Sequence, residues 1–169
     1  MKMIIGLLLL FSIHAAWATD LSLSEAKAEY TVKHIFKTVK GESKDLKGKM
    51  VCQKKICEFL VAIASKSFVS SDSNRDLNMQ TILEVTKFPL ITVKGKLPEA
   101  DLSKQEFEIK SLVSFHGIEK EYTLKIKKGS TFSGHFSILL EDHKVERPSL
   151  LMAKIDNEVP ISFIFNWRE

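Results

Sequence analysis

Apolar and polar residues alternate along much of this 169-residue chain, most clearly in the segment VPISFIFNW near the C-terminus. Val159, Ile161, Phe163, Phe165 and Trp167 fall on every second position of that segment. The same period runs through AEYTVKHIF and FSGHFSILL. Because successive side chains of a strand point to opposite faces, this pattern predicts strands that bury one face against a dry interior.

Eight segments of this kind predict strands, near residues 28–38, 45–53, 56–67, 90–97, 105–116, 120–127, 131–141 and 158–167. The turn signals between them are Gly41, QKK, LPEADLSK, HGIEK and KKGS. No strand-helix-strand rhythm occurs in the sequence, which argues against a parallel sheet. An antiparallel meander of this size can close on itself and remove its exposed edges. The predicted fold is therefore an all-β, eight-stranded antiparallel barrel.

The first eighteen residues, MKMIIGLLLLFSIHAAWA, have the features of a secretory signal peptide. They hold one basic residue, an apolar run from Met3 to Ile13 and an Ala-Trp-Ala ending that suits a signal peptidase. The run is shorter than the roughly twenty apolar residues that span a bilayer. We expect residues 1–18 to be removed and residues 19–169 to form a single exported domain, periplasmic or secreted.

The net charge of the chain is +4, and its lysines are scattered along the sequence. Because they form no basic run, nucleic acid is not an expected partner. A mildly basic surface is typical of plain solvation and allows at most peripheral contact with an anionic membrane.

Two cysteines, Cys52 and Cys57, lie in the segment VCQKKICEF. If QKKI turns a hairpin, the two side chains face each other across it, and an oxidising compartment lets a disulfide persist. The chain-entropy model assigns such a short loop about 2 kcal/mol. The alternatives are a metal site, which needs further ligands nearby, and a redox pair, which normally has a spacing of two residues and not four.

The segment SDSNRDLNMQTILEVTKFP interrupts the alternation and predicts a short helix over about residues 74–86. Ser73 followed three residues later by Asp76 matches a capping box, and Asp76 meets the positive end of the helix dipole. An apolar stripe follows at positions i, i+3 and i+4: Met79, Ile82 and Leu83. We expect this helix to cover one end of the barrel.

Arg75 is the polar residue of this segment with a position suited to binding. It lies four residues before Met79, on the side of the apolar stripe, where its guanidinium would reach a ligand head group at the barrel mouth. The alternative, which is the commoner role for such a residue, is that Arg75 ties the helix to a barrel strand through a carbonyl or carboxylate. Asp76 is expected to cap the helix, and neither residue is expected to do chemistry.

Three segments carry a family likeness. SKSFVSSDSNRDLNMQTILEVTKFPLITVKG resembles the signature segment of the YceI-like family, in which a Ser-rich turn, an Arg-Asp pair opening a helix and a Lys-Phe/Tyr-Pro return to a strand follow one another. FHGIEKEYTLKI is similar to a hairpin of that family, and LLEDHKVERPSLLMAKIDNEVPISF to its closing region. The likeness runs from about Ala28 to Phe165.

This resemblance implies a lipocalin-like barrel of exported proteins, with a long apolar molecule inside, such as a polyisoprenoid or a fatty amide. Two departures from the family pattern are expected to shrink the cavity or move its mouth. The first strand, LSLSEAKAEYTVKH, looks shortened, and the Arg-Asp helix is about two residues shorter than usual.

The alternation of side-chain direction along each strand, which we call strand parity, and the apolar stripe of the helix predict the residues that line the barrel. The candidate ligand-binding residues are Tyr30, Val32, Phe36, Val61, Ile63, Arg75, Met79, Leu83, Ile91, Val93, Phe107, Ile109, Val113, Phe115, Tyr122, Leu124, Phe136, Ile138, Ile161 and Phe163, and parity adds Met50, Ile126 and Phe165 to the lining. An eight-stranded barrel is near the size at which side chains either fill the interior or leave space for one small ligand. For any one of these residues, ordinary core packing is the stronger expectation. Because burial of each methylene stabilises by about 0.8 kcal/mol, a ligand in such a cavity must be an extended hydrocarbon.

Enzyme function is not expected, and no cofactor or metal is predicted. The sequence contains no G-x-S-x-G elbow, H-E-x-x-H motif or phosphate loop. His34, His116, His135 and His143 lack metal-ligand spacing, and the first three fall near strand ends, where turn or surface roles are usual. Three functions remain open: a carrier of an isoprenoid or fatty amphiphile, a filled barrel for interaction or stress protection, and an enzyme acting on lipids.

Overall fold

The computed structural model describes residues 18–150 and 152–168. The predicted signal peptide therefore lies outside the described residues, apart from Ala18. The strands are β1 (Thr19–His34), β2 (Lys37–Ser43), β3 (Leu46–Gln53), β4 (Ile56–Ala64), β5 (Leu90–Pro98), β6 (Glu106–Phe115), β7 (Ile118–Lys128), β8 (Phe132–Leu139), β9 (Ser149–Leu150), β10 (Ala153–Lys154) and β11 (Glu158–Arg168). The helices are α1 (Ser73–Ile82) and three short 3-10 helices: η1 (Ser65–Ser67), η2 (Glu99–Ser103) and η3 (Glu141–His143). No helix in the described part of the chain is long and apolar enough to cross a membrane.

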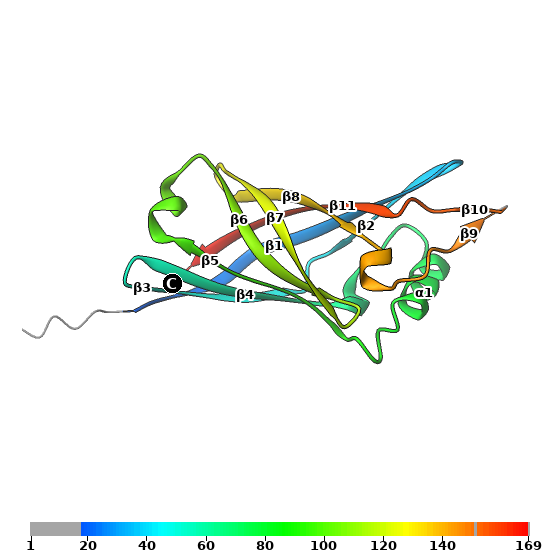
Figure 1. Cartoon of the computed structure of the whole chain (residues 1–169), viewed down its shortest axis with the longest axis horizontal. Coiled ribbons are helices and arrows are strands. Elements are labelled where there is room, and N and C mark those ends of the chain that lie inside the picture. The colour runs from blue at the N-terminus through cyan, green and yellow to red at the C-terminus, as the bar shows by residue number, and fades with distance from the viewer. Residues whose placement is uncertain (1–17, 151, 169) are drawn as a thin grey trace, which may run out of the picture.

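The main sheet is antiparallel and closes into a barrel (Figure 1). Its strand order is β11-β8-β7-β6-β5-β4-β3-β1-β2, and β1 also pairs with β11 to complete the ring. Within this order β2 and β3 follow each other along the same edge of β1, β2 beside residues 28–34 and β3 beside residues 19–22. Nine strands therefore occupy eight positions, and the predicted eight-stranded barrel is confirmed.

The N-terminal part of the prediction needs correction. The first strand begins earlier than the predicted residue 28: β1 has sixteen residues and bends at a bulge between Ser24 and Lys27. The bulge interrupts the alternation, which hid the first half of the strand. The predicted segment 28–38 also crosses the turn between β1 and β2, so the prediction that Phe36 lines the interior is wrong. Phe36 lies in that turn and is 61% exposed.

Gly41 was expected to mark a turn, but it lies within β2. A Cβ at this position would be 2.5 Å from the ring of Tyr30. The residue is thus required for close packing of an aromatic ring on a neighbouring strand. The same arrangement recurs where the ring of Phe163 lies on Gly134. These rings occupy barrel interior that the glycines leave open.

The two ends of the barrel differ (Figure 1). The turn between β3 and β4 and the helix η2 lie at one end, together with the C-terminus. The other end carries α1, the turn between β1 and β2, and the small β9–β10 hairpin. We call these the disulfide end and the helix end, because Cys52 and Cys57 face each other in the β3–β4 register and form a disulfide, with their Cα atoms 4.0 Å apart.

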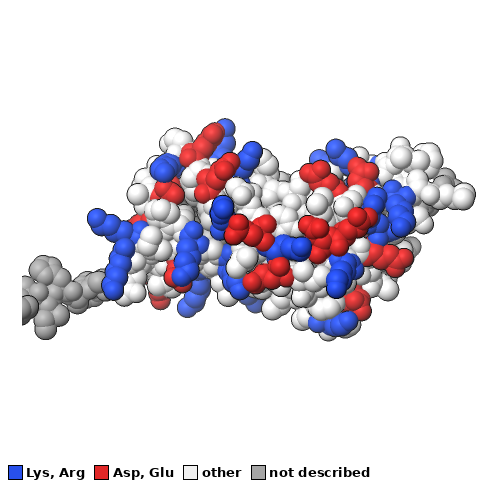
Figure 2. Space-filling model, in the orientation of Figure 1, with Lys and Arg blue, Asp and Glu red and all other residues white. Residues whose placement is uncertain are grey.

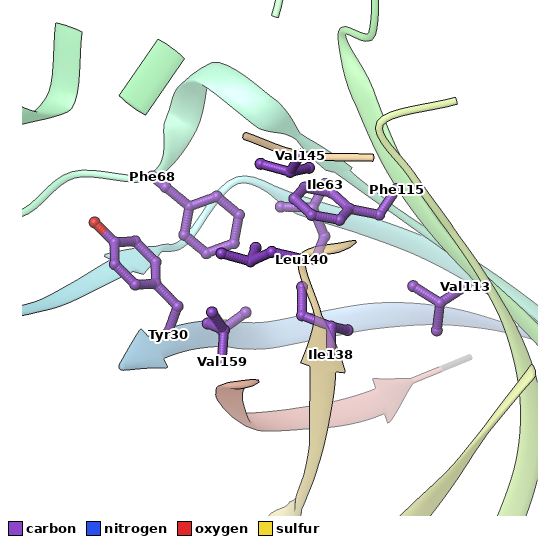
Figure 3. Packing of buried hydrophobic residues seen from close by; sticks show 10 residues of the cluster. Tyr30, Ile63, Phe68, Val113, Phe115, Ile138, Leu140, Val145 and Val159 are labelled. Carbon is purple, nitrogen blue, oxygen red and sulfur yellow. The ribbon is translucent and has the colours of Figure 1, made fainter. Parts of the chain in front are cut away.

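The core is divided in the same way, into two clusters of buried residues. At the helix end, the cluster shown in Figure 3 includes Tyr30, Phe68, Phe115, Leu140 and Val145, and the α1 stripe packs against it. At the disulfide end, the second cluster is built around Met50, the disulfide, Leu97 and Ile109. The predicted apolar stripe of α1 is therefore confirmed as an inward-facing surface.

Candidate ligand-binding site

A cavity of about 510 Å³ lies at the helix end of the barrel. The barrel strands supply Tyr30, Val32, Ile91, Phe115, Ile138, Val159 and Ile161, while Met79 and Ile82 come from α1 and Leu83 from its C-cap. The segment that links β8 to β11 adds Leu140, Val145 and Ile155. The cavity exceeds the lower range of ligand pockets, about 300 Å³, and its floor is aliphatic and aromatic.

Polar side chains gather on the rim of this cavity. They are His34, Lys37, Asp72, Asn74, Arg75, Asn78, Glu146 and Ser149. Two of them are cationic and two are anionic at neutral pH, and the rest offer amide, imidazole and hydroxyl groups. The arrangement suits a molecule with an apolar chain and a polar head that carries no net charge.

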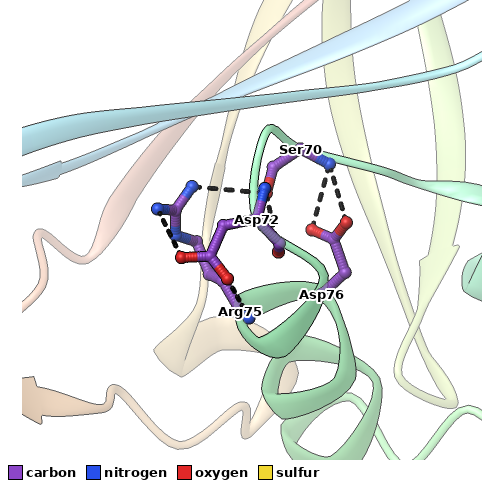
Figure 4. A network of polar contacts seen from close by, with 4 residues as sticks. All are labelled: Ser70, Asp72, Arg75 and Asp76. Carbon is purple, nitrogen blue, oxygen red and sulfur yellow. Dashed lines mark hydrogen bonds and ion pairs between the residues drawn. The ribbon is translucent and has the colours of Figure 1, made fainter.

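The N-terminus of α1 is fixed by two carboxylates (Figure 4). Asp72 is the N-cap, and its side chain accepts a hydrogen bond of 3.1 Å from the backbone N–H of Arg75. The carboxylate of Asp76 is buried and accepts the backbone N–H of Ser70 with both oxygens, each at 3.0 Å. The predicted capping box of Ser73 and Asp76 is therefore wrong by one residue. Asp72 caps the helix, and Asp76 anchors the loop before it.

The helix is also shorter than the predicted span of 74–86. It begins at Ser73 and ends at Ile82, and a series of turns leads on to Phe88. Glu84 in these turns has a φ of 44°, which an α-helix does not allow. The apolar pattern continues through Val85, which explains why the sequence suggested a longer helix.

Arg75 bonds locally and not to a barrel strand (Figure 4). Its guanidinium donates to the carboxylate of Asp72 and to the hydroxyl of Ser70, both at 3.3 Å. The N–H bond from Arg75 and its charge lower the pKa of Asp72. Arg75 nevertheless lines the cavity, and its side chain is about 29% exposed. Tyr30 lies nearby in the wall, and burial, followed by the charge of Asp76, raises its pKa.

The disulfide half of the barrel is filled. The cavity there measures about 80 Å³ and is lined by aromatic rings, among them Phe59, Phe107, Phe132, Phe165 and Trp167. Four of these rings form a chain of contacts from Phe107 through Phe132 and Phe165 to Trp167, with Phe132 and Phe165 stacked at 5.4 Å between centroids. This half has the packing expected of an ordinary core.

Three aromatic residues separate the two halves: Tyr122, Phe136 and Phe163, which we call the aromatic partition. All three pack against both core clusters. The centroids of Tyr122 and Phe136 are 5.6 Å apart, and those of Phe136 and Phe163 are 6.3 Å apart. These rings therefore stand between the two core clusters, and none of them lines the cavity at the helix end.

A third hollow, of about 580 Å³, lies on the outer wall. Its floor crosses several strands, and lysine and glutamate side chains such as Lys125, Lys127, Glu106 and Glu108 border it. It lacks the continuous apolar floor of the cavity at the helix end. The latter is therefore the better candidate for binding an apolar molecule.

The sequence matches the model of the YceI-like domain over residues 17–166. The chain belongs to the YceI-like family. No curated protein matches its sequence.

Solved structures agree with this YceI-like fold. A polyisoprenoid-binding domain from Saccharophagus degradans superposes with a TM-score of 0.69 at 13% identity, covering 88% of this chain and 97% of that one. BcnA of Burkholderia cenocepacia gives a TM-score of 0.71 at 15% identity, over 86% and 97%. The Campylobacter jejuni YceI protein gives 0.62 at 16%, over 81% and 90%. At these identities the likeness shows the fold.

The candidate residues nominated from the YceI-like sequence divide between the two halves. The cavity at the helix end is lined by Tyr30, Val32, Arg75, Met79, Leu83, Ile91, Phe115, Ile138 and Ile161. The small cavity at the disulfide end is lined by Val61, Ile63, Val93, Phe107, Ile109, Leu124, Phe136 and Phe163, and by Met50, Ile126 and Phe165. Phe36 lies in an exposed turn, and Val113 and Tyr122 line neither cavity.

Strand parity missed part of the wall of the YceI-like cavity. Leu140, Val145 and Ile155 come from the irregular segment between β8 and β11, where no period exists to reveal an inward face. Phe68 follows η1 and also lacks a strand pattern. The apolar residues interspersed in LLEDHKVERPSLLMAKIDN were the available signal, since a solvent-exposed linker of that length would be more polar.

Two histidines of the YceI-like chain hold that segment to the barrel. His143 is fully buried, and its Nδ1 faces the carbonyl oxygens of Phe115 and Ile118 at 3.0 and 3.2 Å. Nδ1 therefore donates, and Nε2 accepts from the hydroxyl of Tyr122 at 2.8 Å. Burial lowers the pKa of His143. His116 donates from Nδ1 to the carbonyl of His143 at 2.9 Å.

No group of three or more His, Cys, Asp or Glu side chains within the described ranges is placed to hold a metal ion. His34 lies on the cavity rim, His116 and His143 make the bonds above, and His135 is exposed. The positions of the histidines are those of structural and surface residues.

Proposed function

We propose that this protein binds a single-chain apolar amphiphile, an isoprenoid or a fatty compound, in the cavity at the helix end. The observation that carries the proposal is a cavity of about 510 Å³ with an apolar floor and a polar rim of balanced charge. Burial of a hydrocarbon chain there would stabilise the complex by about 0.8 kcal/mol for each methylene. The protein acts as a carrier or store, without catalysis. A relative of the same fold is a polyisoprenoid-binding domain, which agrees with an apolar ligand.

The size of the cavity limits the length of the chain. A methylene group is similar in size to a water molecule, whose share of liquid volume is about 30 Å³, so the cavity holds about 17 such groups. This corresponds to one fatty chain of ordinary length or to about three isoprene units. The aromatic partition stops a longer chain from reaching the disulfide half.

We also propose that the protein works outside the cytoplasm. The sequence begins with a segment typical of a signal peptide, and β1 starts at Thr19, directly after the expected cleavage site. Removal of residues 1–18 would therefore leave every described strand intact. The disulfide of the β3–β4 hairpin fits an oxidising compartment.

The filled-barrel alternative describes only half of the molecule. The disulfide half has the packing that this alternative requires, whereas the helix half holds a cavity above the usual lower limit for ligands. The cavity favours binding over a purely structural role.

Native mass spectrometry of the purified protein, together with organic extraction, tests the proposed binding. We expect a bound mass that the extract identifies as a single-chain lipid. In Ile91→Trp the added ring would fill the cavity and displace the lipid. Thr92→Trp is the matched control, because the next residue on β5 faces the opposite side of the sheet. If neither the extract nor added farnesol or palmitamide yields a complex, the proposal fails.

A further inference from the structure

Two turns at the helix end expose large apolar side chains. Ile35 and Phe36 form the turn between β1 and β2 and are 71% and 61% exposed. Met152, in the turn between β9 and β10, is 101% exposed. Both turns project further than α1 at the right of Figure 1. We call these three residues the hairpin tips.

The hairpins that carry the tips are joined to each other. Nε2 of His34 donates to the carbonyl oxygen of Ala153 at 3.0 Å. The backbone N–H of Asp156 donates to the carbonyl oxygen of Lys33 at 2.9 Å. The second ring nitrogen of His34 accepts the N–H of Phe36 at 3.3 Å, which fixes the turn itself. The tips are therefore held as one unit.

The same hairpins form the mouth of the proposed binding cavity. Val32, His34 and Lys37 line it from β1 and β2, a few residues from the exposed turn. Ser149 and Ile155 line it from the segment that carries Met152. A surface that receives the hairpin tips would therefore lie next to the opening of the cavity.

Lysines flank the tips. Lys33 and Lys37 stand on either side of the β1–β2 turn, and Lys154 follows Met152 in β10. Within the described residues these three lysines take part in no ion pair, whereas many other lysines of the barrel do. Figure 2 shows that the projecting end is largely uncharged and that Lys and Arg side chains lie next to it, together with Asp and Glu side chains.

We infer that the hairpin tips dock on an anionic lipid bilayer, which is the source or acceptor of the ligand in the proposed function. Apolar side chains that project from a protein enter the boundary between head groups and acyl chains, and neighbouring lysines add attraction to anionic lipids. The docked protein presents the mouth of its cavity to the membrane. A single apolar chain then passes between bilayer and cavity with little exposure to water.

Flotation with lipid vesicles tests the docking. Purified protein is mixed with vesicles of phosphatidylcholine that contain one-third phosphatidylglycerol, and with vesicles of phosphatidylcholine alone. We expect binding to the anionic vesicles that salt weakens. Phe36→Ser combined with Met152→Ser should lower the partition coefficient by about tenfold for each residue. Ile56→Ser, an exposed isoleucine at the disulfide end, is the matched control and should bind like the parent protein.

A tryptophan reporter locates the contact. In Phe36→Trp, we expect the fluorescence to shift to the blue on addition of anionic vesicles, whereas Ile56→Trp should not respond. An unchanged Phe36→Trp spectrum, or equal vesicle binding by the double serine variant and the parent, overturns the docking. Self-association through the tips without vesicle binding also overturns it and assigns the surface to a second copy of the chain.

Ligand binding measured without membranes separates the two proposals. Farnesol or palmitamide added from ethanol should load the double serine variant as well as the parent, because the tips do not line the cavity. Loading without vesicle docking leaves the proposed function standing and removes the docking. Vesicle docking without loading of farnesol or palmitamide would remove the proposed binding function and leave the docking standing.

Discussion

At the scale of single residues, a buried hydroxyl in the barrel wall is out of place. Ser111 on β6 is almost completely buried, and its Oγ has no hydrogen-bond partner among the described residues. It lies opposite Gly95 on β5, next to the ring of Phe59. A buried polar group without a partner loses the hydrogen bonds that water gives it in the unfolded chain.

We predict that Ser111→Ala raises the free energy of unfolding by about 1 kcal/mol, because alanine removes the unsatisfied hydroxyl and keeps the small volume. Ser43→Ala is the control. Ser43 is equally buried, but its hydroxyl bonds to Ser67 and accepts the N–H of Asp45, so its loss should destabilise. Urea unfolding measures both variants. A destabilised Ser111→Ala would mean that the hydroxyl has a partner such as a bound water.

His143 should make stability depend on pH. Burial lowers the pKa of His143 in the folded state, whereas the unfolded side chain titrates near about 6.5. Below that pH the unfolded chain binds the extra proton more readily. The free energy of unfolding therefore falls as the pH is lowered from about 6.5 toward the pKa of His143 in the folded protein, by up to about 1.4 kcal/mol for each pH unit.

Urea unfolding of the parent and of His143→Gln between neutral and mildly acidic pH checks this. The glutamine variant starts from lower stability, since the bonds to Phe115 and Ile118 change, but it should lack this component of the pH dependence. If the free energy of unfolding falls equally with pH in the two proteins, His143 is excluded as the cause of the pH dependence.

Residues whose role follows from regular structure could be predicted from the sequence. Met79 and Ile161 face inward because helix and strand periods place them there. Phe36 and Asp72 could not be placed, because one is apolar within a turn and the other caps one residue before a second good cap, Ser73. The geometry of the loops sets the positions of both residues, and the sequence pattern gives little information about loop geometry.

At the scale of elements, the β3–β4 hairpin is the most constrained. Cys52 and Cys57 are directly opposite in the register, and the turn residues Lys54 and Lys55 both have positive φ, at 51° and 67°. Lysine adopts this conformation less readily than asparagine or glycine. The disulfide therefore holds a turn for which the sequence is poorly suited.

We predict that replacing Cys52 and Cys57 together by serine lowers the free energy of unfolding by about 2 kcal/mol and leaves ligand binding unchanged. The hairpin lies at the disulfide end, whereas the proposed cavity lies at the helix end. Thermal unfolding and native mass spectrometry measure the two effects, and the reduced parent protein provides the comparison. Loss of the lipid from a folded double variant would place the cysteines in the site.

Strands were the elements that the sequence predicted best. The strands from β3 onward agree with the prediction within about three residues, apart from the short β9 and β10. β2 was missed because the turn before it has no glycine or proline. The sequence pattern predicts no element between Asp142 and Asn157, since the structure there depends on tertiary bonds such as those of His143.

At the scale of the whole molecule, one barrel contains two different interiors. The aromatic partition separates the filled half from the open half, and the hydrogen bond from Tyr122 to His143 ties it to the segment that lines the cavity. The sequence predicted a lining but not this division, because parity gives the direction of a side chain and not how closely its neighbours approach.

We predict that Phe163→Leu lets the protein accept longer chains. The smaller side chain opens the partition toward the cavity of about 80 Å³, so the upper limit of chain length should increase by a few carbons. Native mass spectrometry with a graded series of fatty amides measures that limit. Trp167→Leu, which enlarges the filled half without removing a ring of the partition, is the control. An unchanged limit in Phe163→Leu would show that the partition does not set the length.

The pairing of β1 with β11 joins the first strand of the barrel to the last. During synthesis, β1 has no partner on that side until nearly the whole chain has emerged. Contacts between residues so distant in sequence make folding slow, and unpaired strand edges promote aggregation in the meantime. The ring thus becomes complete only when its final segment arrives, and until then one edge of β1 stays open to pairing with other chains.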